Sequence, residues 1–500
     1  MSKFIEPKRP KGFRDLFGED IKLRNAMLDK IRAVYELYGF EPLETPAMEY
    51  VETLGKFLPE TDTPEGGIFA LQDDADEWIA LRYEFTTPLS RIIAQYPELP
   101  LPFRRYQLGP VWRVEKPKPG SFREFIQFDI DTVGTESMAA DAEICSVLAE
   151  AMEKIGIQRE NYIVKVNNRK ILNGVLETAG IKIFLDESNL TQLALQTLRT
   201  IDKLDRIGIS GIEDLLTTGR LDESGDFMKG VGLNSEQVKI IIDYLNITSK
   251  SRKDFCEKLK SVIGNSRIGL DGIQELEDID RYLSVIGIDE HRVIFDPTIV
   301  RGLTYYTGPI YEVFLTFDIT DENGNKKQFG SVAGGGRYDD LVQRFLGKKV
   351  PATGASIGVD RLLVALKLLN KAQVQSAFPP VLVTTIDKNL MLEYQKITAE
   401  LRNAGISAEM YLGQGGFKKQ LKYADKKNIY IAVILGSDEF ENNQITIKDL
   451  KLGEKLSKQI EDRDKWRKEQ PAQIIIPRHN LVNEIRKIID KSGLSQIKYK

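Results

Sequence analysis

Apolar side chains recur at helical spacing over residues 20–38 and stop at Gly39. This pattern predicts a helix that ends on a glycine C-cap, because glycine readily adopts the left-handed conformation that closes a helix. Residues 40–46 contain two prolines, which disfavour helix and predict an extended segment.

Two later segments, 104–115 and 122–134, predict a pair of strands joined by the loop 116–121. The second strand alternates strictly, and successive side chains of a strand point to opposite faces of its sheet. One face would carry Phe122, Glu124, Ile126, Phe128 and Ile130, and the other would carry Arg123, Phe125, Gln127, Asp129 and Asp131. A face that combines an arginine, an amide, carboxylates and an aromatic ring favours a binding site over a core.

The remaining pattern predicts two strand-bearing parts separated by helices. A helix is expected at 138–156 and a long, mostly helical region at 177–290. Strands are expected at 293–295, 303–316 and 329–333, followed by a glycine-rich turn at 334–339 and a helix at 358–369. After a linker at 378–380, strands at 381–386, 407–412 and 430–435 alternate with helices, which is typical of a small α/β domain. Residues 461–500 predict a charged strand-and-helix extension.

Composition narrows the class of protein. A chain of 500 residues exceeds what one hydrophobic core supports, so two to four domains are expected. No apolar run approaches the length of about 18 residues that a membrane span needs. With two cysteines, Cys145 and Cys256, and two histidines, a disulfide framework and a Cys- or His-based zinc site are disfavoured. We therefore expect a cytoplasmic or organelle-matrix protein, the cytoplasm being the location that we predict, which holds no zinc and does not associate with a membrane.

The distribution of charge is compatible with a polyanionic partner. The whole chain has a net charge of −4, yet residues 379–500 contain 22 Lys and Arg against 16 Asp and Glu. A basic end on an acidic body is compatible with nucleic-acid binding, although most charge runs are solvated faces.

Candidate chemistry comes from arginines, because the chain contains no GxxxxGK[ST] phosphate loop, no GxSxG, no HExxH and no protein-kinase signatures. Arg113 ends the first predicted strand, Arg301 leads the block RGLTYYTG, and Arg361 lies at a helix start. Arginine binds phosphate through a planar fork and stays protonated. Any one of them alone favours a structural salt bridge, but the three together favour the activation of a carboxylate by ATP, which requires positioning and charge neutralisation rather than a general base.

At these residues the chain resembles the class II aminoacyl-tRNA synthetases, and among them the histidyl-tRNA synthetase family. The segment 39–46 is similar to the first class II motif, residues 109–127 to the second and residues 354–361 to the third. The blocks LRYEFTTPLSR at 81–91, RGLTYYTG at 301–308 and GGGRYDDL at 334–341 are similar to the histidine-specific signals. The resemblance covers roughly residues 5–465 and thins over 180–290.

The resemblance implies an α+β fold with four parts. An antiparallel-sheet catalytic domain would span 1–176 and 291–372, with a helical insertion at 177–290 that grips the tRNA acceptor arm. A small α/β anticodon-binding domain would span 379–460, followed by the charged extension at 461–500. The implied activity is the ligation of L-histidine to tRNA(His), with ATP and Mg²⁺ as a substrate complex and a homodimer formed through the first motif.

The resemblance also implies roles for individual residues. Arg301 and Arg113 would be catalytic, with Arg301 the main cation at the transition state. Histidine would be bound by Glu84, Thr86, Gln127, Asp131, Tyr305 and Tyr306, with Tyr306 and Asp131 reading the imidazole. ATP would be bound by Arg113, Glu115, Phe125 and Arg361, and Tyr338 would close the pocket or serve as a core tyrosine. Lys418, Lys419 and Lys422 would contact tRNA.

Two positions depart from the family pattern. Thr304 stands where the family has Asp, and Ser121 stands where it has an arginine aimed at the distal phosphates and the acceptor end.

Two other functions stay open. The main alternative to a histidine ligase is the regulatory subunit of ATP phosphoribosyltransferase, a non-ligase on the same fold that typically lacks the C-terminal domain. The other alternative is a prolyl or threonyl synthetase, against which the 301–308 block argues.

Overall fold

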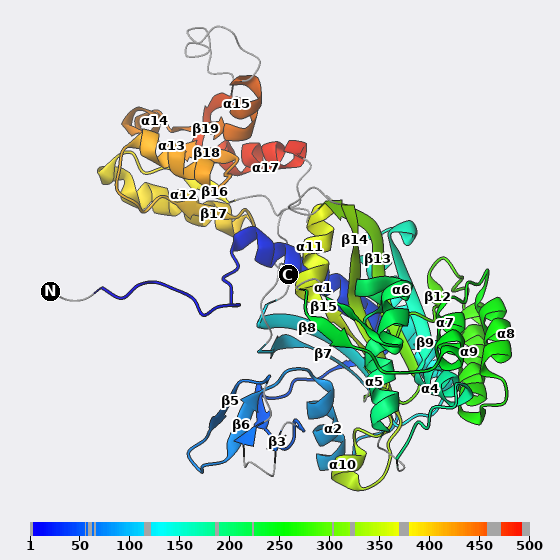
Figure 1. The fold of residues 1–500 in the computed structure, drawn as a ribbon. Helices are drawn as coiled ribbons and strands as arrows, with labels where there is room; N and C mark the ends of the chain where they lie inside the picture. Colours follow the sequence, from blue (N-terminus) through cyan, green and yellow to red (C-terminus); the bar gives the residue numbers. More distant parts are fainter. Residues whose placement is uncertain are drawn as a thin grey trace. The chain divides into compact units, whose positions relative to one another are not determined.

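The computed structural model describes residues 4–55, 57–58, 63–64, 67–114, 122–185, 190–222, 225–302, 305–320, 326–369, 380–457 and 472–492. The chain divides into two compact units, Met1–Ala372 and Gln373–Lys500. Each unit combines a sheet with helices (Figure 1), as the α+β prediction expected.

The first unit is built on an eight-stranded sheet with the order β1-β7-β8-β15-β14-β13-β9-β12. Neighbours pair antiparallel except at the two ends, where β1 runs parallel to β7 and β12 runs parallel to β9. The sheet is therefore antiparallel where the site residues lie and mixed only at its edges. Its strands are β1 (Glu41–Pro42), β7 (Phe103–Trp112), β8 (Glu124–Val133), β9 (Tyr162–Asn168), β12 (Val293–Phe295), β13 (Pro309–Thr320), β14 (Lys326–Arg337) and β15 (Ala352–Gly358).

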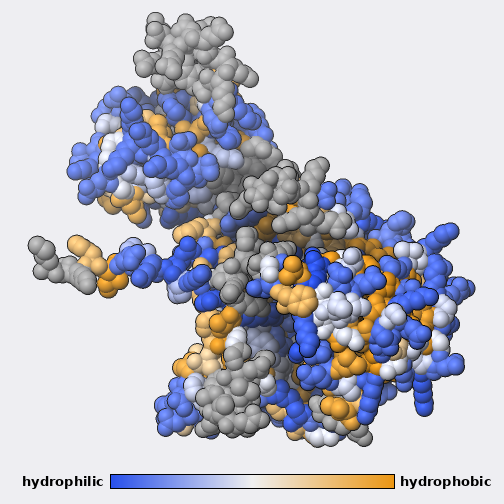
Figure 2. Space-filling model, in the orientation of Figure 1, coloured by the Kyte–Doolittle hydropathy of each residue, from blue (hydrophilic) through white to orange (hydrophobic). Residues whose placement is uncertain are grey.

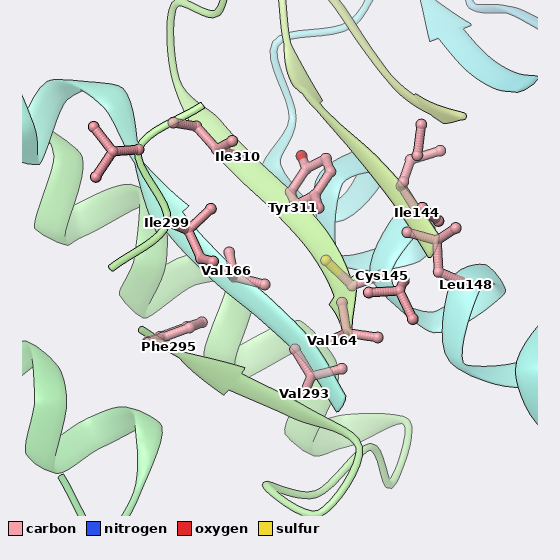
Figure 3. Packing of buried hydrophobic residues seen from close by; sticks show 14 of the residues in the cluster. Ile144, Cys145, Leu148, Val164, Val166, Val293, Phe295, Ile299, Ile310 and Tyr311 are labelled. Atoms are coloured by element: carbon pink, nitrogen blue, oxygen red, sulfur yellow. The ribbon is translucent and has the colours of Figure 1, made fainter. Parts of the chain in front are cut away.

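Helices pack their apolar side chains onto this sheet. The predicted helix at 20–38 is α1 (Gly18–Leu37), and Gly39 ends it with a φ of +77°. The buried helix α3 (Met138–Lys154) contributes Ile144, Cys145 and Leu148 to the core beside β9, β12 and β13 (Figure 3). Further helices of this unit are α2 (Thr86–Gln95), α4 (Arg169–Thr178), α10 (Gln343–Leu346) and α11 (Val359–Leu368). Smaller sheets in this unit comprise β2 (Met48–Tyr50), β5 (Ala70–Gln72) and β6 (Trp78–Leu81), and β3 (Phe57–Leu58) with β4 (Thr63–Pro64).

The described part of the chain between α4 and β12 is mostly helical, with one short hairpin, β10–β11. Its elements are α5 (Gln192–Ile201), α6 (Leu204–Leu216), β10 (Gly219–Leu221), β11 (Phe227–Lys229), α7 (Ser235–Leu245), α8 (Arg252–Ile263) and α9 (Arg267–Val285). Its buried residues, such as Ile241, Leu259 and Leu276, share one continuous apolar cluster with the sheet. The helical region thus packs on the sheet as part of the first unit.

Two predicted boundaries around the site were wrong. The strand expected at 303–316 begins only at Pro309, because Gly302 has a φ of +66° and accepts hydrogen bonds from the amides of Tyr305 and Tyr306 in a turn. The turn expected at 334–339 is strand through Arg337, since Gly334–Gly336 pair with both β13 and β15. Glycine normally weakens a strand, and here it lets neighbouring groups approach the backbone closely.

The second unit is a five-stranded sheet of order β17-β16-β18-β19-β20 packed against helices. Its strands are β16 (Val381–Val383), β17 (Ala408–Met410), β18 (Ile431–Ile434), β19 (Gln444–Asp449) and β20 (Gln473–Pro477). Its helices are α12 (Met391–Asn403), α13 (Phe417–Lys426), α14 (Ser437–Glu441), α15 (Leu450–Ser457) and α17 (Leu481–Ser492). The strand and helix expected near the chain end are β20 and α17, which complete this sheet and its core. The face of this unit seen in Figure 2 is mainly hydrophilic.

Among the described residues, no helix is both long enough and apolar enough to cross a membrane.

Candidate active site

A pocket of about 600 Å³ opens on the first unit, lined by side chains from several separate segments of the chain. The strands β8, β13, β14 and β15 supply its sheet-borne residues, the loop before β13 and the segment around α2 supply others, and α11 contributes its first turn. Most of the residues expected to bind substrate line it, namely Glu84, Thr86, Arg113, Phe125, Gln127, Arg301, Tyr305, Tyr306 and Arg361.

Two of its arginines are held by backbone carbonyls and aromatic rings. The Arg113 Nε donates to the Tyr83 carbonyl at 3.1 Å, and its guanidinium lies 5.1 Å from the centre of the Phe125 ring. Arg361 donates to the Phe329 carbonyl at 2.9 Å and lies 5.5 Å from the Phe329 ring centre. These contacts leave part of each planar fork for an anionic ligand, because a guanidinium has five N–H donors.

The third arginine, Arg301, depends on a glycine. Its Nη1 donates to the Glu312 carboxylate at 2.6 Å, and its side chain is 41% exposed. A Cβ on Gly334 would overlap the Arg301 guanidinium, so any other residue at that position would force the guanidinium to move from where it lies. The ion pair with Glu312 orients a cation that remains open to the pocket.

The pocket wall near α2 supplies acceptors and hydroxyls. Both oxygens of Glu84 accept from the first turn of α2, from the amides of Thr86 at 2.5 Å and Thr87 at 2.8 Å. These two hydrogen bonds fix the carboxylate at the helix N-terminus, where the helix dipole favours a negative group. Across the pocket, the Gln127 amide donates to the Ser356 hydroxyl at 2.7 Å, which leaves its carbonyl oxygen without a partner among the described residues.

Three tyrosines form an aromatic cluster beside the pocket. The Tyr305 ring lies 5.1 Å from Tyr306 and 5.6 Å from Tyr338, centre to centre. The Tyr306 ring passes between Gly302 and Gly336, and a Cβ on either glycine would overlap it. Burial raises the pKa of Tyr306 to about 12, so its hydroxyl is a hydrogen-bond donor at neutral pH.

Asp131 lies behind the pocket wall and does not line the cavity. One of its oxygens pairs with the fully buried Arg105 at 2.7 Å, and the other accepts from the Tyr338 hydroxyl. Tyr338 is itself 3% exposed, does not line the pocket, and packs its ring against the lining residue Tyr305. Both residues therefore act from the buried layer next to the site.

Asp129 is a lining residue to which sequence reasoning gave no role. It is 4% exposed, lines the pocket, and has one oxygen without a hydrogen-bond partner among the described residues. The strand alternation had placed it on the polar face, so the signal was present. The resemblance to the family implied roles for Gln127 and Asp131 but none for Asp129, which lies between them on the strand.

Burial raises the pKa of Asp129 to about 7, and Asp131 and Glu84 add to this rise against the opposing charge of Arg105. Between about pH 4 and about pH 7 the folded chain therefore binds more protons at this carboxyl than the unfolded chain does. Its ionisation consequently lowers the free energy of unfolding as pH rises through that range.

We expect Asp129→Asn to be more stable than the unmodified chain at pH 8, and the difference to shrink at pH 5. The amide cannot ionise, so the variant avoids a desolvation cost on the order of 1 kcal/mol or more. Differential scanning calorimetry at the two pH values measures the gap between thermal midpoints. A gap that is constant with pH would contradict a raised pKa at this site.

Several expected residues lie elsewhere. Glu115, Ser121 and Thr304 are outside the described residues. Lys418, Lys419 and Lys422 belong to the second unit, where they line a shallow pocket at the start of α13. Within the described ranges, no group of three or more His, Cys, Asp and Glu side chains is arranged to hold a metal ion.

Comparison with known proteins covers nearly the whole chain. The profile of the family described as Histidyl-tRNA synthetase matches residues 12–362, and that of the Anticodon binding domain matches residues 380–470. Histidine–tRNA ligases of Cereibacter sphaeroides and Paracoccus denitrificans are each 51% identical, over 96% of this chain and 97% of their own length.

Solved structures agree with these matches. The histidyl-tRNA synthetase of Nostoc sp. PCC 7120 superposes with a TM-score of 0.71 at 30% identity, covering 97% of this chain and all of that one. An ATP phosphoribosyltransferase regulatory subunit/histidyl-tRNA synthetase from Bacillus halodurans has a TM-score of 0.65 at 20% identity, covering 85% of this chain and 97% of that one. The second likeness shows a shared fold only.

Proposed function

The chain belongs to the histidyl-tRNA synthetase family, and from that premise we propose that it is a histidine–tRNA ligase whose active site is the pocket beside β8 and β14. The reaction activates L-histidine with ATP to histidyl-adenylate and pyrophosphate, then transfers histidine to the 3′ end of tRNA(His) with release of AMP. The observation that carries the proposal is that Arg113, Arg301 and Arg361 line one pocket together with Glu84 and Gln127.

The regulatory-subunit alternative is not favoured. The curated relatives that match nearly end to end are ligases, and the second unit matches an anticodon-binding domain. The three pocket arginines are also present in this chain.

The arrangement suits the adenylation step. A substrate carboxylate oxygen attacks the α-phosphorus of MgATP, and pyrophosphate leaves with the electrons of the broken P–O bond. Negative charge grows on the α-phosphate oxygens, and fixed cations stabilise it without reorganising. We assign Arg113 and Arg301 to that charge and Arg361 to the γ-phosphate side, with Phe125 stacking on adenine.

The opposite end of the pocket suits the amino acid. Glu84, fixed by α2, and the Thr86 hydroxyl would hold the substrate ammonium, while Gln127 would face its carboxylate. Tyr306 and the neighbouring carboxylates would bind the imidazole. Polar partners at both ring nitrogens reject an isostere, because the isostere would leave them buried and unpaired.

The test of the function is ATP–pyrophosphate exchange with each of the twenty amino acids. We expect exchange with histidine alone, at a rate that requires Mg²⁺. Exchange with proline, threonine or no amino acid would overturn the assignment. Charging of tRNA(His) transcripts then tests the transfer step.

The C-terminal unit suits tRNA through the lysines that open α13. Lys418, Lys419 and Lys422 are exposed at a helix N-terminus, where both the charge and the backbone amides favour phosphate. Phosphate contacts position an RNA without reading its sequence.

We expect the triple variant Lys418→Ala, Lys419→Ala, Lys422→Ala to weaken tRNA(His) binding by about tenfold or more and to flatten its salt dependence. Histidine-dependent exchange should not change, because the first unit catalyses it. The matched control replaces Lys396, Lys451 and Lys487, lysines of the same unit that are each paired with a glutamate of their own helix. Equal losses in both triples would remove the specific role of α13.

Four finer statements complete the proposal. The enzyme works as a homodimer through the segment 39–46 that is similar to the first class II motif, and it works in the cytoplasm. Its catalytic domain and helical insertion follow the boundaries expected from the sequence, with 177–290 as the insertion, whereas its anticodon-binding domain includes β20 and α17. Mg²⁺ enters with ATP, because magnesium is commonly held by nucleotide phosphates and only one or two carboxylates.

A further inference from the structure

An arginine of the segment before α1 is tied to two residues of the pocket wall. Residues 4–17 form neither helix nor strand and lead into α1 (Figure 1). Within them, Arg14 forms an ion pair with the Asp360 carboxylate, and its guanidinium lies 4.0 Å from the centre of the Phe122 ring. Asp360 and Phe122 both line the pocket, whereas Arg14 does not. Arg14 therefore contacts the wall without lining the cavity.

The backbone that leads into this arginine is held at the base of the β7–β8 hairpin. The Gly12 carbonyl accepts from the Arg123 amide at 2.9 Å, and the Arg123 carbonyl in turn accepts from the Arg113 amide at 2.9 Å. The Phe13 ring packs edge-on to the Phe69 ring, with 6.1 Å between the ring centres. The arginine side chain thus reaches the pocket wall from a fixed stretch of backbone.

Asp360 joins two walls of the pocket. It lies in the first turn of α11, next to Arg361, and its side chain is 7% exposed. One of its oxygens accepts from the Ile126 amide of β8 at 2.8 Å, and the other pairs with Arg14. Removing one partner of a buried ion pair leaves the other charge without compensation. Without Arg14, that charge would stand directly beside Arg361.

A triphosphate is the ligand that such a charge would affect most. The proposed function assigns Arg361 to the γ-phosphate side, and Asp360 is its neighbour on α11, so Asp360 lies at the ATP end of the pocket. A carboxylate there repels phosphate oxygens unless a cation balances it, because like charges brought together cost free energy. Glu84, at the histidine end, is held by the amides of α2 instead.

We propose that Arg14 is a positioning residue for ATP, which balances the charge of Asp360 and keeps the Phe122 ring in the pocket wall. The inference rests on the proposed function and deepens it, because it gives the segment before α1 a part in ATP binding. None of the three segments that are similar to the class II motifs includes this residue. Loss of Arg14 should therefore weaken the binding of ATP and leave the binding of histidine as it is.

The experiment measures the Kd for ATP, and both KM values of histidine-dependent ATP–pyrophosphate exchange, in Arg14→Met at pH 8. Methionine keeps an apolar stem against Phe122 but removes the charge. The Kd and the KM for ATP should rise about tenfold or more, while the KM for histidine stays within about twofold, because only one substrate faces the unbalanced carboxylate. Arg9→Met is the matched control and should change none of these constants. Arg9 belongs to the same segment and pairs with Asp15, and both of these side chains are more than half exposed.

Further variants separate the charge from support of the fold. Arg14→Lys keeps a cation and should recover part of the ATP affinity. In the double variant Arg14→Met, Asp360→Asn the side chain at 360 is uncharged and its amide oxygen can still accept from β8, so the Kd for ATP should return to within about threefold of that of the unmodified enzyme. A residue that only stabilised the fold would show no such recovery. Arg14→Gln, which donates hydrogen bonds without a charge, repeats the test if the methionine variant does not fold.

The inference is overturned if the uncharged variants at Arg14 bind ATP as tightly as the unmodified enzyme, or if they lose affinity for ATP and histidine in equal proportion. A double variant that binds ATP no better than Arg14→Met also overturns it. Absence of histidine-dependent exchange in the unmodified enzyme would instead overturn the proposed function, and the Kd for ATP would still measure the effect of Arg14. The two failures are therefore distinguishable.

Discussion

Replacing Arg301 with alanine should lower the rate of histidine-dependent ATP–pyrophosphate exchange by about 100- to 1,000-fold while changing the Kd for ATP less than about threefold. Arg301 is held by Glu312 and is open to the pocket between the two substrate ends, so we expect it to meet charge that develops only in the transition state. Single-turnover adenylation and equilibrium binding of ATP separate these quantities.

Two variants sharpen that result. Arg301→Lys keeps the charge but not the planar fork, and should recover only part of the rate. Gly334→Ala leaves Arg301 in the sequence but places a methyl group where the guanidinium lies, so it should mimic the loss of Arg301. A variant at Arg301 that loses ATP affinity in proportion to rate would contradict a role confined to the transition state.

Replacing Arg105 with methionine should lower the free energy of unfolding by about 3–5 kcal/mol at pH 8. Arg105 is fully buried and pairs with Asp131, while Asp129 lies on the same strand face. Without the guanidinium, both carboxyls are left buried with no cation to offset them. Urea titration that follows the unfolding of the first unit measures this loss in the free energy of unfolding.

The loss should have a distinct pH dependence. Burial raises the pKa of Asp131 to about 6, so protonation near pH 5 removes much of the uncompensated charge and should shrink the deficit. The double variant Arg105→Met, Asp131→Leu should recover a substantial part of the stability, since replacing a whole buried pair with apolar groups is often neutral. An Arg105→Met protein as stable as the unmodified chain at pH 8 would show that the pair contributes nothing.

The pattern of apolar and polar residues correctly predicted the elements that depend on interactions between residues close together in the sequence. The alternation over 122–134 placed Phe125, Gln127 and Asp129 on one face, and that face lines the pocket. The helix ending at Gly39 and the α/β pattern after residue 380 were found for the same reason.

Features that depend on pairing between strands far apart in the sequence could not be predicted from local pattern. Nothing near Asp131 in the sequence shows that Arg105 and Tyr338 occupy its oxygens, because these residues come from β7 and from the segment after β14. Gly334–Gly336 looked like a turn because glycine is common in turns. The glycines are explained by contacts with distant segments: Arg301 lies against Gly334, the β15 backbone against Gly335, and Tyr306 against Gly336.

The glycines of β14 also limit how this enzyme can change. Where Arg301 and Tyr306 cross the sheet, the surface beneath them is bare peptide backbone, with no side chain that a mutation could enlarge, charge or reshape. A new amino-acid preference would therefore have to arise from β8, from the α2 segment or from the 305–306 turn. Attempts to redesign the substrate range, by selection or by engineering, should concentrate their accepted substitutions there and leave residues 334–336 untouched.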